Sequence, residues 1–132
     1  MSERFSHILL AEDDEDDVDL FQSALLEVCP GVKLTVAING VELLKALPAL
    51  PGPNVIVLDL NMPMKSGKEC LLEIRKIKKF DNVPVIILST SGYKGDIDFC
   101  LSNGADKYLQ KPASVEHMKR IAEMLCVEAM GN

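Results

Sequence analysis

The chain has 132 residues and a formal net charge of −6, from 14 basic and 20 acidic residues. This length favours one domain with an ordinary hydrophobic core, and a hydrophobic share of 48% argues against disorder. The acidic balance disfavours nucleic acid and anionic membranes, because both are bound through basic patches. We therefore expect a single domain over residues 1–132, with a core over about residues 6–128, and neither nucleic acid nor a membrane as a partner.

Nothing in the sequence indicates export or membrane insertion. The N-terminal stretch has too little apolar sequence before its acids for a signal peptide, and the apolar runs are far shorter than the ~20 residues of a membrane span. The four cysteines, Cys29, Cys70, Cys100 and Cys126, include no C-x-x-C pair and no histidine at zinc-finger spacing. We expect them to be reduced, apolar residues of a cytoplasmic protein, with no structural zinc.

Short apolar segments alternate with helical patterns along the whole chain. Five segments are predicted to be strands, because they are short and rich in apolar or β-branched residues: 7–11, 33–38, 55–59, 85–88 and 107–110. Between and after them, apolar residues recur at helical spacing within 18–28, 41–47, 70–77, 97–101 and 115–125. This alternation favours an α/β fold in which helices cover both faces of a parallel sheet.

Local signals predict where some helices begin and end. Asn39 with Glu42, and Ser66 with Glu69, have the spacing of helix-capping pairs. The helix after Ser66 is expected to end in a lysine-rich turn, which would suit the helix dipole. The proline-rich segment 48–53 predicts a turn-rich connector.

Polar side chains follow four of the predicted strands. Glu12 and Asp13 follow the first, Asp59 ends the third, Ser89 follows the fourth and Lys111 follows the fifth. Because the carboxyl ends of parallel strands open on one edge of the sheet, we expect these groups to converge there, where ligands bind in open α/β sheets.

These groups have the chemistry of a phosphoryl-accepting site. Three close carboxylates repel one another unless a cation is present, and carboxylate oxygens together with a phosphate suit Mg²⁺. The ammonium group of Lys111 can neutralise an incoming anion, and the hydroxyl of Ser89 can donate to a phosphate oxygen. The set predicts a carboxylate, Asp59, that receives a phosphoryl group.

The chain resembles the receiver domains of two-component response regulators over almost its whole length. Four segments carry the resemblance, in the order and at the spacing of that family: Ile8–Asp14, Val57–Pro63 with Gly67, Val85–Thr90 and Gly104–Pro112. The resemblance implies a flavodoxin-like receiver fold, with a five-stranded parallel sheet of order 2-1-3-4-5 and five helices on its two faces.

The resemblance also implies roles for individual residues around a metal. Asp59 would be the phosphoacceptor and a ligand of Mg²⁺ (or Mn²⁺). Asp13 would bind the metal directly, Glu12 would bind it through water, and Asn61 would contribute its backbone carbonyl. Asn61 would also tune dephosphorylation, together with Ser91.

Further roles concern the response to phosphorylation. Lys111 would contact the phosphoryl group, and the Lys111–Pro112 peptide bond would be cis. Ser89 would be the switch hydroxyl and Tyr108 the switch aromatic residue. They would change the surface of the fourth helix, the fifth strand and the fifth helix.

The implied partners are a sensor histidine kinase or a histidine phosphotransfer protein, which donates the phosphoryl group, and a downstream protein target. The implied activity is that of a switch, with at most self-catalysed phosphorylation and dephosphorylation.

Two features depart from the family pattern. Thr90 stands where many receivers have alanine, and the acids continue through Asp16 and Asp17, which we interpret as favourable charges at a helix N-terminus. The acid run and the Ser-Thr-Ser after the fourth strand most resemble small stand-alone regulators, including those associated with phytochrome-type kinases.

The sequence disfavours three other functions. Haloacid-dehalogenase-type phosphatases also phosphorylate an aspartate at a strand end, but they need an acid two residues later, where this chain has Asn61. A flavin-binding module would hold phosphate on a Ser/Thr/Gly loop after the first strand, where this chain has acids. A degenerate receiver that only binds partners would not need Asp13, Asp59 and Lys111 together.

Overall fold

The structure is a computed structural model that describes residues 6–49 and 53–130. The strands are β1 (His7–Ala11), β2 (Lys33–Ala37), β3 (Val55–Leu58), β4 (Val85–Ser89) and β5 (Lys107–Gln110). The helices are α1 (Glu15–Val28), α2 (Gly40–Ala49), α3 (Gly67–Ile74), α4 (Lys94–Ser102) and α5 (Val115–Met130), with a short 3-10 helix at Lys78–Phe80. Strands and α-helices alternate along the chain, as predicted.

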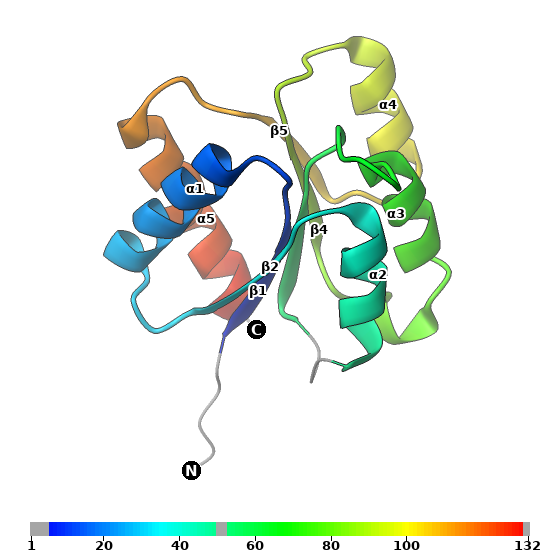
Figure 1. Cartoon of the computed structure of the whole chain (residues 1–132), viewed down its shortest axis with the longest axis horizontal. Helices are drawn as coiled ribbons and strands as arrows, with labels where there is room; N and C mark the ends of the chain where they lie inside the picture. Colours follow the sequence, from blue (N-terminus) through cyan, green and yellow to red (C-terminus); the bar gives the residue numbers. More distant parts are fainter. Residues whose placement is uncertain (1–5, 50–52, 131–132) are drawn as a thin grey trace.

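The five strands form one parallel sheet in the order β2-β1-β3-β4-β5. Helices α1 and α5 cover one face of the sheet, and α2, α3 and α4 cover the other (Figure 1). The hydrophobic core is accordingly divided by the sheet into two clusters, one under each group of helices. The predicted flavodoxin-like topology is confirmed.

The central strands explain why the sequence showed continuous apolar runs. Every residue of β1, β3 and β4 is buried, because helices cover both faces of the sheet. The edge strands β2 and β5 are largely half-exposed and contain more polar residues. Both faces of the central strands are therefore unavailable to a ligand, and a site must lie at the strand ends.

The predicted capping pairs are present. The Ser66 side chain accepts from the backbone N–H of Glu69, and the Glu69 carboxylate accepts from the N–H of Ser66. The Asn39 side chain accepts from the N–H of Glu42 at 2.8 Å. These caps begin α3 and α2 directly after the loops at the carboxyl ends of β3 and β2, and so restrict those loops.

Strands β2, β3 and β4 each end one residue from the predicted position, and two expectations about the ends of helices were wrong. Helix α3 ends at Ile74, before the lysines that were expected to form its last turn. There the guanidinium group of Arg75 donates to the carbonyl oxygens of Phe80, Val83 and Gly104, at 2.9 to 3.0 Å, and these contacts favour a compact turn over a longer helix. Helix α2 extends through Ala49 into the predicted connector, whose residues 50–52 lie outside the described part of the chain.

The expectation of four reduced cysteines was also wrong. Cys29 and Cys126 form a disulfide with a Cα–Cα distance of 6.1 Å, whereas Cys70 and Cys100 are free and buried. The physical reason is the packing of α1 against α5: both helices run away from the carboxyl edge of the sheet, so their C-terminal parts meet at its other end (Figure 1). The two cysteines are 97 residues apart in sequence, so no local spacing pattern could indicate that they pair.

None of the helices in the described ranges combines the length and the apolar character that a membrane crossing requires.

Candidate functional site

The register of the sheet brings two of the predicted acids together. Ala11 of β1 pairs with Leu58 of β3, so the residues that follow them, Glu12 and Asp59, leave the sheet side by side. The backbone N–H of Asp59 donates to the carbonyl of Ala11 at 3.0 Å, which fixes this arrangement. The backbone pairing of β1 with β3 is thus sufficient to place these two carboxylate residues side by side.

Glu12, Asp13 and Asp59 form a cluster in which one carboxylate oxygen of each lies within 4.8 Å of the others. Glu12 and Asp59 are 3% and 5% exposed, whereas Asp13 is exposed. A pocket of about 310 Å³ lies beside Glu12 and Asp13. Oxygen donors at this separation, partly open to solvent, fit an ion such as Mg²⁺ or Mn²⁺, which keeps several of its waters.

Lys111, which directly follows β5, completes the site. Its backbone N–H donates to the carbonyl of Ser89 at 2.7 Å, which sets the path of the chain after β5. Its ammonium nitrogen lies 2.7 Å from Glu12 and 3.6 Å from Asp59. It also lies 2.7 Å from a carboxylate oxygen of Asp17. The lysine side chain is only 12% exposed, so its ammonium group is largely shielded from solvent beside the acids.

The electrostatics are those of a crowded, buried acidic site. Burial raises the pKa of Glu12 to about 7, and the charge of Asp59 adds to the rise, although the hydrogen bond from Lys111 opposes it. Burial also raises the pKa of Asp59, against the charge of Lys111 and the backbone N–H of Asn61. Burial alone would lower the pKa of Lys111, but its contacts with Asp17 and Glu12 raise it. The lysine therefore stays charged, while Glu12 is only partly ionised near neutral pH.

This electrostatic situation predicts that the metal-free protein loses stability as the pH rises. The pKa of Glu12 is near 4.5 in the unfolded chain and about 7 in the folded one, so the folded state binds the proton more tightly. The contribution of Glu12 to the unfolding free energy is therefore largest below pH 4.5 and is lost as the pH rises through 7. We expect Glu12→Gln to remove this loss, and the difference in unfolding free energy from the wild type to grow by roughly 2 kcal/mol across that window.

Urea unfolding in the presence of a chelator, at several pH values, measures this difference. Glu15→Gln is the matched control, because Glu15 is an exposed acid in the first turn of α1. If the unfolding free energy of the wild type changed with pH in parallel with that of Glu12→Gln, the pKa of Glu12 would not be raised by folding.

The predicted switch residues lie together at the end of β4. The Ser89 side chain is fully buried and its oxygen accepts from the N–H of Ser91 at 3.2 Å. The Tyr108 hydroxyl donates to the carbonyl of Ser91 at 2.7 Å, and its half-buried ring packs against the core cluster under α2, α3 and α4. Ser91 in turn donates to Asp96 of α4 at 2.6 Å. This chain of contacts connects the site to α4.

Two further expectations concern the loops. Asn61 is exposed, two residues after Asp59, and its backbone N–H stabilises the Asp59 carboxylate. The Lys111–Pro112 bond was expected to be cis, but no described peptide bond is cis. The expectation was wrong because it was carried over from the resemblance, whereas the trans isomer is the intrinsically favoured one even before proline.

The sequence interpretation missed the role of Asp17. We assigned it to the helix dipole, but its carboxylate forms an ion pair with Lys111, 94 residues away. A local signal existed: Asp17 lies four residues before the buried Phe21, so helical spacing places both on the inward face of α1.

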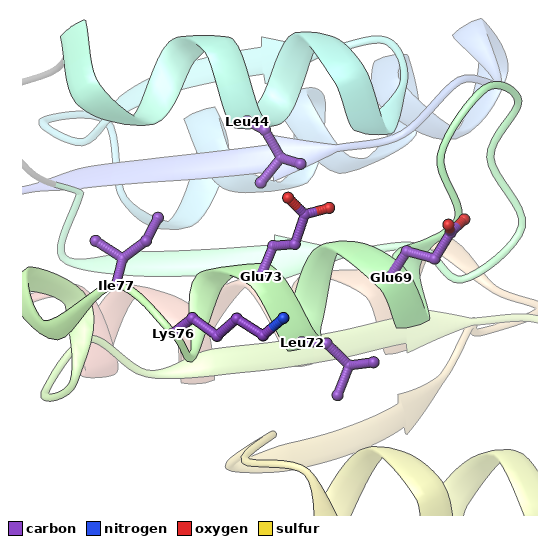
Figure 2. Close-up of a pocket in the computed structure, with 6 residues that line it drawn as sticks. All are labelled: Leu44, Glu69, Leu72, Glu73, Lys76 and Ile77. Carbon is purple, nitrogen blue, oxygen red and sulfur yellow. The ribbon is translucent and has the colours of Figure 1, made fainter.

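A larger pocket, of about 570 Å³, lies away from this site, between α2 and α3. Figure 2 shows Leu44 of α2 pointing toward Glu73 of α3, with Ile77 at the end of the pocket. None of its lining residues belongs to the predicted site, so its size does not bear on the chemistry at Asp59.

The fold and the site together define a doubly wound α/β domain with an acidic, lysine-containing site at the carboxyl edge of its sheet. Residues 8–123 match the response regulator receiver domain family. The chain belongs to this family, and it is therefore a phosphoacceptor domain of two-component signalling.

Relatives of similar length support this assignment. The chain is 30% identical over 122 residues to the response regulator Rcp1 of Synechocystis, covering 88% of this chain and 83% of Rcp1. It is also 30% identical over 115 residues to the two-component response regulator ORR12 of Oryza sativa subsp. japonica, covering 87% and 93%.

Solved structures agree. The phosphorylated cyanobacterial phytochrome response regulator RcpA superimposes with a TM-score of 0.89 at 28% identity, over 96% of this chain and 95% of RcpA. The Mn²⁺-bound form of Rcp1 superimposes with a TM-score of 0.83 at 28% identity, over 92% of each chain. The predicted likeness to regulators associated with phytochromes is matched by RcpA.

Proposed function

We propose that Asp59 accepts a phosphoryl group from the phosphohistidine of a sensor histidine kinase or a histidine phosphotransfer protein. The observation that carries the proposal is the placement of the Asp59 carboxylate, which lies beside two further acids and 3.6 Å from the Lys111 ammonium. In the transfer, the bond between phosphorus and the histidine nitrogen breaks, and a bond between phosphorus and an Asp59 oxygen forms. Hydrolysis later releases inorganic phosphate and restores the carboxylate.

Glu12, Asp13, Asp59 and the backbone carbonyl of Asn61 are the groups that we propose to hold Mg²⁺ or Mn²⁺. The Mn²⁺-bound form of Rcp1 supports the choice of ion. When bound, such an ion supplies positive charge to the transferring phosphoryl oxygens and reduces the repulsion among the acids. Lys111 supplies the second positive charge, and its raised pKa keeps it protonated throughout.

The signal is proposed to leave the site through β4 and β5. The Ser89 hydroxyl would turn from the N–H of Ser91 toward a phosphoryl oxygen, and this would alter the contact between Ser91 and Tyr108. Because Ser91 also holds Asp96, the change reaches α4. The surface of α4, β5 and α5 is thus where we propose that a downstream protein binds, with the chain acting as a switch and not as a turnover enzyme.

Incubation with acetyl phosphate and Mg²⁺, followed by intact-mass measurement, tests the proposal. We expect the wild type to gain one phosphoryl group, and we expect a chelator to prevent the gain. Asp59→Asn should lose the gain completely, because an amide oxygen does not form a stable acyl phosphate. Asp81→Asn, which removes an exposed acid elsewhere, should keep it. A mass gain of equal size in Asp59→Asn would refute the assignment of Asp59.

A further inference from the structure

Lys111 is held by a residue that the proposed phosphoryl chemistry does not require. Its ammonium nitrogen lies 2.7 Å from Asp17 and 2.7 Å from Glu12, but 3.6 Å from Asp59, which is beyond hydrogen-bonding distance. Two of the three N–H donors of the lysine are therefore directed to Asp17 and Glu12. In this arrangement the lysine is not bonded to the residue that would carry the phosphoryl group.

Within residues 6–49 and 53–130, the Asp17 carboxylate has no hydrogen-bond or ion-pair partner other than Lys111. The helix is capped by Asp14, whose side chain accepts from the backbone N–H groups of Asp16 and Asp17 at 2.9 and 3.1 Å. The carboxylate of Asp17 is 37% exposed, whereas the Lys111 side chain is 12% exposed. Because the Asp17 side chain takes no part in this cap, its contact with Lys111 can break without loss of the start of α1.

The contact joins two segments that are far apart in sequence. The start of α1 and the connection between β5 and α5 lie at the same end of the sheet, where the acids also lie (Figure 1). A phosphoryl group on Asp59 would replace the single negative charge of the carboxylate with about two negative charges on the phosphoryl oxygens. Lys111 would then either leave Asp17 for the phosphoryl oxygens or keep a carboxylate close to them, and both outcomes oppose the phosphorylated form.

We propose that Asp17 is a positioning residue that competes with a phosphoryl group on Asp59 for the ammonium of Lys111. Asp17 thereby favours the unphosphorylated state. The inference rests on the proposed function, because it requires Asp59 to be the phosphoryl site. Since the ion pair is partly exposed, its loss should change the binding of a phosphoryl mimic by about two- to fivefold.

Binding of beryllofluoride, a tetrahedral phosphoryl mimic, at saturating Mg²⁺ tests this inference. Calorimetry or fluorine NMR gives the dissociation constant for the wild type, Asp17→Asn, Asp17→Glu and Asp16→Asn. Asp16→Asn is the matched control: it removes the same charge from the same turn, and within the described residues Asp16 forms no ion pair. The ¹⁵N resonance of the Lys111 ammonium, recorded before beryllofluoride is added, reports directly on the contact.

We expect Asp17→Asn to bind beryllofluoride about two- to fivefold more tightly than the wild type, and Asp16→Asn and Asp17→Glu to stay close to the wild type. The Lys111 resonance should move in Asp17→Asn only. Equally tighter binding in Asp16→Asn would mean that any loss of negative charge from this turn has the same effect. Weaker binding in Asp17→Asn would mean that Asp17 assists the phosphoryl group. Either result overturns the inference. Failure of the wild type to bind beryllofluoride would instead count against the proposed function.

Discussion

Gly67→Ala is expected to lower the unfolding free energy by about 3 kcal/mol and to slow the phosphorylation of Asp59 strongly. Gly67 begins α3, and a Cβ atom there would meet the backbone carbonyl of Asp59 and lie 2.8 Å from Cα of Leu60. These are backbone atoms that cannot rotate away. The loop after β3 would have to move, and with it the carboxylate of Asp59. Urea unfolding and the rate of mass gain with acetyl phosphate measure the two effects.

Gly31→Ala provides the matched control, because a Cβ atom at Gly31 would meet no atom within 4 Å. Its unfolding free energy should stay within about 0.5 kcal/mol of the wild type. If Gly67→Ala behaved like Gly31→Ala, the close approach of α3 to the site loop would not be a constraint.

Reduction of the Cys29–Cys126 disulfide is expected to lower the unfolding free energy by about 3 to 4 kcal/mol. The bond closes a loop of 97 residues, so its loss greatly enlarges the conformational freedom of the unfolded chain. The bond lies at the end of the sheet away from Asp59. Acetyl phosphate should therefore phosphorylate the reduced protein as it does the oxidised protein, under conditions in which the reduced protein is still folded.

The comparison uses urea unfolding with and without a reductant. In the double variant Cys29→Ala and Cys126→Ala, the reductant should have no effect, since Cys70 and Cys100 are already free thiols. Identical unfolding curves for the oxidised and reduced wild type would contradict the prediction.

The sequence was sufficient for features that depend on neighbouring residues. Strands β1 and β5 have the predicted bounds, because a short run of strand-forming residues between polar ones has few alternatives. The placement of Glu12, Asp59 and Lys111 at one edge was also predictable, since parallel strands all end on the same side.

Features that depend on distant segments could not be predicted in the same way. Helix α3 stops at Ile74 because Arg75 binds carbonyl groups from three later positions. The bond between Cys29 and Cys126 requires the relative placement of α1 and α5. The pairing of Asp17 with Lys111 requires the same placement at the other end of the sheet, and helical spacing alone could show only that Asp17 faces inward.

The most direct test of the role of Asp59 is to locate the phosphoryl group on the chain. Borohydride reduces an aspartyl phosphate to homoserine, so treatment of the phosphorylated protein followed by peptide mass spectrometry identifies the modified residue. If Asp59 is the phosphoacceptor, homoserine should replace Asp59 and no other residue. Homoserine in place of Asp13, with Asp59 intact, would contradict this role.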